Sequence, residues 1–128
     1  MKFNKIHHVA IICSDYEKSK GFYVNVLGLE VISEVFREDR RSYKLDLAVG
    51  NHCQIELFSF PNSPERLSYP EGAGLRHLAF EVEDLPFSIN HLKAYGITVE
   101  PIRYDPLTKK HFTFFTDPNG LPIELYEA

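Results

Sequence analysis

The sequence contains two copies of one residue pattern, and an internal repeat of this kind constrains the fold before any motif is considered. Residues 8–12 read His-Val-Ala-Ile-Ile and residues 77–81 read His-Leu-Ala-Phe-Glu, an offset of 69 positions at the histidines. Each run leads through an acidic residue, Asp15 or Asp84, into a helical pattern. The repeat therefore predicts two copies of one structural unit.

Each copy begins as a strand, continues as a helix and ends in further strands. In the first copy, Ser14 and Glu17 form a capping-box pair at the helix start, and Gly28 supplies the left-handed turn at the helix end. In the second copy, Pro86 lies in the first helical turn and Gly96 ends the helix. The further strands are predicted at Glu30–Phe36, Tyr43–Val49, Cys53–Phe60, Thr98–Ile102, Phe112–Thr116 and Ile123–Tyr126.

This order predicts an α+β protein made of two β-α-β-β-β modules, at about 4–60 and 75–127. A loop at 61–74, rich in proline and glycine, joins the modules. A length of 128 residues with 44% hydrophobic content favours a single domain, 1–128, that contains both modules.

Four polar side chains are expected on the strand faces that point away from the helices. Because side chains alternate along a strand, each copy places one histidine and one glutamate opposite its apolar residues, His8 with Glu56 and His77 with Glu124. The spacings of 48 and 47 residues keep the two pairs in register. An ionised carboxylate among apolar neighbours costs on the order of several kcal/mol unless a cation or hydrogen-bond donors compensate it.

A divalent cation would neutralise both glutamates. Imidazoles and carboxylates together suit Ni, Zn, Mn or Fe(II) and do not select among these metals. A lone histidine in a strand is more often a packed residue, and a lone glutamate usually faces water, but four such positions in register favour a metal site. The other histidines lack this register and are interpreted as surface or packing residues: His7, His52, His91 and His111.

The charge balance and the cysteines limit the partners and the compartment. A net charge of -4 leaves no basic excess to hold a nucleic-acid backbone. The N-terminal apolar run is too short and too polar for a signal peptide or a membrane span. Cys13 and Cys53 lie in apolar runs and are interpreted as reduced thiols. We expect a cytoplasmic protein that binds a small-molecule substrate and neither nucleic acid nor membrane.

These motifs together resemble the vicinal oxygen chelate superfamily and, within it, the glyoxalase I-like branch. The likeness covers nearly the whole chain. It rests on residues 8–11, 22–23, 27–29, 55–57 and 76–80, and on Asp117-Pro118-Asn119-Gly120 leading to Ile123-Glu124-Leu125.

The resemblance implies a curved, cup-shaped mixed sheet with the helices on its outside. It also implies that His8, Glu56, His77 and Glu124 bind one divalent metal ion, and that the protein is a homodimer. A set of two histidines and two glutamates resembles lactoylglutathione lyase, so the substrate would be a hemithioacetal of a 2-oxoaldehyde and a thiol. Proton transfer would pass through a metal-bound enediolate, with Glu124 as the base. Glu56 would be the partner that acts on the other enantiomer of the substrate.

Two positions depart from the pattern of glutathione-using glyoxalases. Ile12 stands where an arginine is expected four residues after the first ligand, and Phe60 stands where an asparagine is expected four residues after the second. The identity of the thiol cosubstrate therefore stays open. The alternatives are another metalloenzyme of the superfamily, such as an epimerase, a thiol transferase or an Fe(II) dioxygenase, and a small-molecule binding or resistance protein. The metal site could lie within one chain or be shared across a dimer.

Basic residues in loops could compensate for the missing arginine, although most residues of this kind are simply solvated. The cluster around residues 103–111 could meet an anionic substrate tail. The candidates are Arg37, Arg40, Arg41, Arg103, Lys109, Lys110 and His111.

Overall fold

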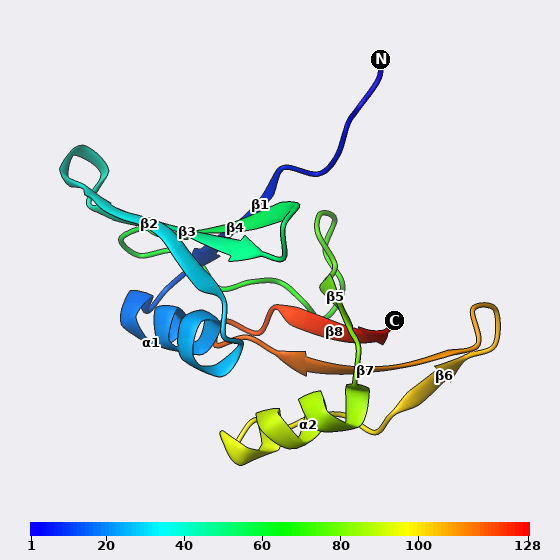
Figure 1. The fold of residues 1–128 in the computed structure, drawn as a ribbon. Helices are drawn as coiled ribbons and strands as arrows, with labels where there is room; N and C mark the ends of the chain where they lie inside the picture. Colours follow the sequence, from blue (N-terminus) through cyan, green and yellow to red (C-terminus); the bar gives the residue numbers. More distant parts are fainter. The chain divides into compact units, whose positions relative to one another are not determined.

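The computed structural model describes residues 1–128, and the chain divides into two compact units, Met1–Glu65 and Arg66–Ala128. Each unit contains a strand, a helical segment and three further strands in that order (Figure 1). Each unit also has its own four-stranded mixed sheet. The α+β class and the predicted β-α-β-β-β order of both modules are therefore confirmed.

The first unit is built around a sheet with the strand order β1-β4-β3-β2. Strands β1 and β4 are parallel, and the other neighbours are antiparallel. Its elements are β1 (His8–Cys13), α1 (Tyr16–Gly21), a π-helical segment (Phe22–Val26), β2 (Glu30–Arg37), a 3-10 turn (Glu38–Arg40), β3 (Ser42–Val49) and β4 (Cys53–Ser59).

The second unit repeats this topology with the strand order β5-β8-β7-β6. Strands β5 and β8 are parallel, and the remaining neighbours are antiparallel. Its elements are β5 (Leu78–Val82), α2 (Leu85–Ala94), β6 (Arg103–Asp105), β7 (Lys110–Thr116) and β8 (Pro122–Glu127). The longest helix, α2, has 10 residues, and none of the helices has the length and apolar character that a membrane span requires.

The helix starts correct one prediction. Asp15 is the N-cap of α1, and its carboxylate accepts a hydrogen bond from the backbone N–H three residues later. The predicted capping box of Ser14 and Glu17 is therefore wrong by one position. Asp84 caps α2 in the same way, so the acidic residue of each repeat copy sets where its helix begins. Aspartate and serine are equally good N-caps, which is why the local sequence left the choice open.

A second correction concerns the strand predicted at Thr98–Ile102. The regular strand is the later β6, and the predicted segment follows β7 through isolated contacts, in which Glu100 N–H donates to the Phe114 carbonyl at 2.9 Å. The Thr113 hydroxyl in turn donates to the Glu100 carbonyl at 2.7 Å. Pro101 has no N–H for a sheet ladder, and this interrupts the strand that the β-branched neighbours favour.

One face of each sheet forms the core of its unit together with the helical segment. In the first unit the fully buried side chains include Tyr23, Leu45, Leu47, Ile55 and Leu57. In the second unit the core includes Leu85, Ile89, Leu92, Phe115, Ile123 and Leu125. Because side chains alternate, the residues between these core positions point to the opposite face of each sheet.

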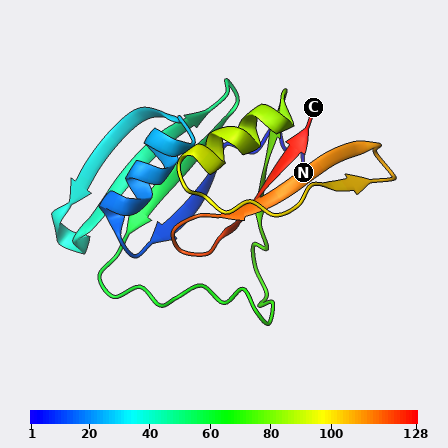
Figure 2. The same cartoon turned by 90° about the horizontal axis from the view of Figure 1, so that it is seen from below.

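The segment between β4 and β5 contains neither helix nor strand, as predicted for the loop (Figure 2, green). Arg66 organises its second half. The Arg66 guanidinium donates to the carbonyls of Leu75 and Arg76, both at 2.8 Å, and to the Ser68 hydroxyl at 2.8 Å. These bonds fix the backbone that enters β5.

Candidate metal-binding site

The first unit brings His8 and Glu56 together. They lie on the neighbouring parallel strands β1 and β4, where Ala10 is directly opposite Glu56. His8 Nε2 is 3.3 Å from Glu56 Oε2. The Glu56 side chain is 13% exposed and that of His8 is 42% exposed. The small alanine leaves room for both longer side chains on this face.

The second unit brings His77 and Glu124 together in the same arrangement. His77 lies immediately before β5, and Ala79 is opposite Glu124 on β8. His77 Nε2 is 3.0 Å from Glu124 Oε2, and the two side chains are 27% and 12% exposed. Each glutamate therefore faces the alanine that follows its histidine by two positions, so the two units repeat one arrangement.

The geometry of each pair fits two ligands of one cation. Two donor atoms that sit about 2.0–2.2 Å from a metal, at angles between square and tetrahedral, lie about 2.8–3.6 Å apart. The measured separations of 3.3 Å and 3.0 Å fall in this range. The chain contains no group of three or more His, Cys, Asp or Glu side chains placed to hold a metal, so each unit presents two donors. Convergence of the two pairs on one ion stays a prediction.

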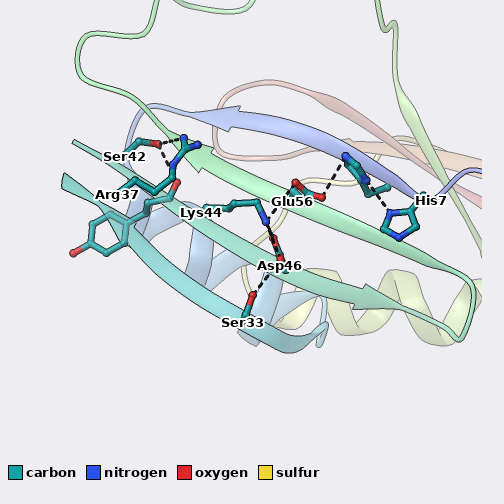
Figure 3. Close-up of polar contacts among 9 residues, drawn as sticks. His7, Ser33, Arg37, Ser42, Lys44, Asp46 and Glu56 are labelled. Atoms are coloured by element: carbon teal, nitrogen blue, oxygen red, sulfur yellow. Dashed lines mark hydrogen bonds and ion pairs between the residues drawn. The ribbon is translucent and has the colours of Figure 1, made fainter. Parts of the chain in front are cut away.

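Charged residues surround the first pair (Figure 3). Asp46 on β3 lies directly opposite Glu56. Lys44 lies between the two carboxylates, with its Nζ atom 2.7 Å from Asp46 Oδ1 and 3.6 Å from Glu56 Oε1. Ser33 on β2 donates to the other oxygen of Asp46 at 3.1 Å. The hydrogen bond to Asp46 raises the pKa of Lys44 above its ordinary value, so its ammonium is charged at neutral pH.

An aromatic ring replaces these charges beside the second pair. Phe114 on β7 lies opposite Glu124, at the place that Asp46 occupies in the first unit. The Phe114 ring meets the His77 ring edge to face, with centroids 5.1 Å apart. The carboxylate of Glu124 has His77 as its one ion-pair partner.

The residue before each histidine contacts that histidine's other ring nitrogen. His7 Nδ1 is 2.9 Å from His8 Nδ1, and Arg76 Nη1 is 3.4 Å from His77 Nδ1. An imidazole that binds a metal through Nε2 donates its Nδ1–H to an acceptor, so His7 Nδ1 can orient His8 in this way, whereas the Arg76 guanidinium, which has only N–H donors, cannot orient His77. His7 is exposed, as interpreted from the sequence, but its contact with His8 was missed. The available signal was that His7 and Arg76 occupy equivalent positions of the repeat.

A cavity of about 280 Å³ lies within the second unit and includes His77 in its wall. The wall combines the second half of the loop between β4 and β5, which the Arg66 guanidinium holds by hydrogen bonds, with residues of β6, β7 and the turn before β8. Its lining residues are Arg66, Leu67, Ser68, Tyr69, Glu71, Gly72, Arg76, His77, Thr98, Glu100, Arg103, Phe114, Phe115, Thr116, Gly120 and Pro122.

The basic residues proposed to compensate for the missing arginine separate into two groups. In the first unit, Arg37 lies over the rings of Phe58 and Phe60, which stack with centroids 6.1 Å apart. In the second unit, Arg103 lines the cavity. Lys110 binds the carbonyl of the C-terminal residue and His111 pairs with Glu127, so both serve local structure.

Neither cysteine forms a disulfide. Cys13 is buried, whereas Cys53 is partly exposed at the start of β4.

Comparison with known proteins identifies the family. A family model described as the Glyoxalase/Bleomycin resistance protein/Dioxygenase superfamily matches residues 5–125. The uncharacterized protein YwkD of Bacillus subtilis (strain 168) is 61% identical over 99% of each chain. The crystal structure of the glyoxalase family protein from Enterococcus faecalis is 50% identical, has a TM-score of 0.91, and is matched over 99% of this chain and 100% of that chain.

More distant relatives carry the names of several different enzymes. The probable lactoylglutathione lyase of Vibrio cholerae serotype O1 is 28% identical over 99% of this chain and 93% of its own. A 2-epi-5-epi-valiolone epimerase of Actinomyces sp is 27% identical (94% and 77%), and the metallothiol transferase FosB of Staphylococcus saprophyticus is 28% identical (94% and 75%). By its family model, its near relatives and its repeated fold, the chain belongs to the Glyoxalase/Bleomycin resistance protein/Dioxygenase superfamily.

Proposed function

We propose that the protein is a divalent-metal-dependent, glyoxalase I-like lyase. Its substrate would be the hemithioacetal of a 2-oxoaldehyde and a small thiol, and its product a 2-hydroxyacyl thioester. The observation that supports this most is the repeated histidine–glutamate pair, with donor separations of 3.3 Å and 3.0 Å in the two units. A complete set of two imidazoles and two carboxylates distinguishes this chemistry from sites with a single glutamate.

The metal ligands in this proposal are His8, Glu56, His77 and Glu124, acting together on one ion of Ni, Zn, Mn or Fe(II). When bound, this cation supplies Lewis-acid stabilisation of the negative charge that develops on the substrate oxygens. The four ligands come from one chain or from two chains of a homodimer.

Glu124 is the proposed base. It removes the proton from the carbon next to the substrate carbonyl and returns it to the neighbouring carbon. The surroundings favour Glu124 for this movement because His77 is its one ion-pair partner, whereas Glu56 is also within 3.6 Å of the Lys44 ammonium. A carboxylate with fewer restraints can move more easily between ligand and base positions. Glu56 would act as the base for the other enantiomer of the hemithioacetal.

The family supports enzymatic chemistry on a small molecule, and the Vibrio cholerae relative carries the name of the proposed activity. The identity of the thiol is left open, because Ile12 and Phe60 offer no side-chain donor where glutathione-using enzymes have arginine and asparagine. A cytoplasmic location is part of the proposal, consistent with two cysteines that form no disulfide.

The test is a screen of metal-reconstituted protein against hemithioacetals of methylglyoxal with several cellular thiols, run in deuterated water. We expect thioester formation with deuterium at the new C–H bond for one of the thiols, and close to one divalent ion per site. The control is the His8→Ala/His77→Ala double variant, which should be inactive. Absence of both turnover and stoichiometric metal would refute the proposal.

An epimerase is the second candidate, favoured by the presence of two carboxylates that could serve opposite faces of one carbon and by the valiolone epimerase relative. An epimerase would exchange deuterium into an unmodified substrate without any thiol. Oxygen consumption with Fe(II) would instead indicate a dioxygenase, transfer of a thiol to a substrate a thiol transferase, and tight ligand binding without turnover a binding or resistance protein.

A further inference from the structure

The cavity of the second unit is positively charged although the whole chain carries a net charge of -4. Arg66, Arg76 and Arg103 line it, against two carboxylates, Glu71 and Glu100. Three arginines against two glutamates leave the lining with an excess of one positive charge, opposite in sign to the net charge of the protein, and a positive excess favours anionic ligands.

Arg66 and Arg103 already have structural partners. The Nε and Nη2 atoms of Arg66 donate to Ser68 and to two backbone carbonyls of the loop. Arg103 pairs with Glu100 and lies over the Phe114 ring, 5.3 Å from its centroid. Both guanidinium groups still contribute charge, but most of the hydrogen-bonding capacity of Arg66 is used within the protein.

Arg76 differs from both. It is exposed, no carboxylate pairs with it, and its Nη1 contact with His77 Nδ1 is long, at 3.4 Å. A guanidinium carries five N–H donors in a planar fork that matches the oxygens of a carboxylate or phosphate. Arg76 therefore presents an unused oxyanion-binding group directly beside a proposed metal ligand.

The remaining lining supports a ligand with an apolar stem and a charged end. Leu67 and Phe114 offer apolar contact, while Ser68 and Tyr69 carry hydroxyl groups. The volume of about 280 Å³ suits a small molecule rather than a macromolecule.

We propose that this cavity binds an oxyanion group of the substrate, a carboxylate or a phosphate, with Arg76 as the main contact and Arg103 as the second. This inference rests on the proposed function, because His77 connects the cavity to the metal site. Arg76 is then a specificity residue. It supplies an anion contact, whereas Ile12 and Phe60 of the first unit have no side-chain donor. The substrate class narrows to adducts of an anionic thiol.

The experiment measures the affinity of three methyl thioethers of matched length that end in an amide, a carboxylate or a phosphate. Binding is followed by NMR titration of the protein as purified, with its metal content determined. The variants are Arg76→Gln and Arg103→Gln, and the control is Lys93→Gln, which removes an exposed positive charge from α2 outside the cavity.

We expect at least one anionic thioether to bind the wild type roughly tenfold more tightly than the amide, the size of one good charge-assisted contact. Arg76→Gln should remove most of this preference, Arg103→Gln should remove part of it, and Lys93→Gln should leave it intact. The affinity of the amide, measured in each variant, is the baseline from which the anion preference of that variant is calculated. The anionic probe that binds more tightly shows whether the cavity prefers a carboxylate or a phosphate.

Equal affinity for all three thioethers in the wild type would overturn the inference. So would an anion preference that survives in Arg76→Gln, because the anion would then bind elsewhere, for example to the metal. These outcomes differ from failure of the proposed function. Arginine-dependent anion binding without hemithioacetal turnover would reject the lyase activity and support the anion site. Equal turnover of neutral and anionic thiol adducts would support the lyase activity and reject the anion site.

Discussion

The first and second units bring the same two side chains together but surround them differently. Opposite Glu56 lies Asp46, bridged by Lys44, whereas opposite Glu124 lies the Phe114 ring. The repeat keeps the two donors at fixed positions, while the neighbouring strand supplies charge in one unit and an apolar ring in the other. The comparison teaches that two glutamates related by the repeat need not have the same role.

The physical difference is in how each carboxylate is restrained. The Lys44 ammonium beside Glu56 attracts that carboxylate and offsets its electrostatic repulsion from Asp46. Glu124 has a single imidazole partner and an aromatic neighbour that offers no competing hydrogen bond. We therefore expect Glu56 to act mainly as a ligand and Glu124 to act as both ligand and base.

The largest expected effect is that of Glu124→Gln on proton transfer. The amide keeps the shape of the side chain and a ligating oxygen but cannot accept the substrate proton, so the exchange rate should fall roughly 100- to 10,000-fold while metal is retained. Glu56→Gln should lower the rate by a smaller factor. Solvent deuterium exchange and metal analysis measure the two effects. Equal losses in both variants would mean that the two units are equivalent in catalysis.

The next effect is on metal affinity when either histidine is removed. His8→Ala and His77→Ala should each weaken binding by more than about 100-fold, because even outer partners of metal ligands contribute 10- to 100-fold. His52→Ala, an exposed histidine, is the matched control. Competition with a fluorescent chelator gives the affinities. If only one of the two histidines matters, the pairs do not share an ion.

Lys44→Met tests the charged surroundings of the first pair. Without the ammonium, Asp46 and Glu56 face each other as like charges across adjacent strands, so stability should fall by about 1 kcal/mol. Metal affinity should rise several-fold, since a cation next to the ligand has been removed. Urea unfolding and metal titration measure both, with the exposed Lys18→Met as control. Unchanged metal affinity would show that Lys44 does not influence the site.

The smallest effect concerns acid stability. A hydrogen bond from Lys20 lowers the pKa of Glu34 in the first unit, and backbone N–H donors lower the pKa of Asp105 and Glu127 in the second. A carboxylate with a lowered pKa contributes stability that is complete above its unfolded value of about 4 and is lost as the pH falls through the lowered value. Urea unfolding should therefore show a decline in this acid range.

Glu34→Gln should reduce this acid dependence in the first unit, and the Asp105→Asn/Glu127→Gln double variant should reduce it in the second. A probe placed in each unit separates the two contributions. If neither variant changes the slope of stability against pH, other carboxylates control the acid response.

Most strands could be predicted from the sequence because alternation of apolar and polar residues is a local signal. Strands β3, β4, β7 and β8 begin and end within two residues of their predicted bounds. The strand at Thr98–Ile102 failed because Pro101 breaks the backbone ladder that its neighbours favour. The capping box at Ser14 failed because Asp15 competes for the same role one residue later.

The sequence by itself determined which residues are candidate ligands. The repeat and the two-residue period of a strand put His8, Glu56, His77 and Glu124 on equivalent faces, whatever the details of packing. Only the tertiary structure decided what lies beside each pair. Lys44 meets Glu56, and Arg76 enters the wall of a cavity, through strand register and loop path. Such neighbours are distant in sequence, and no local periodicity encodes a contact between them.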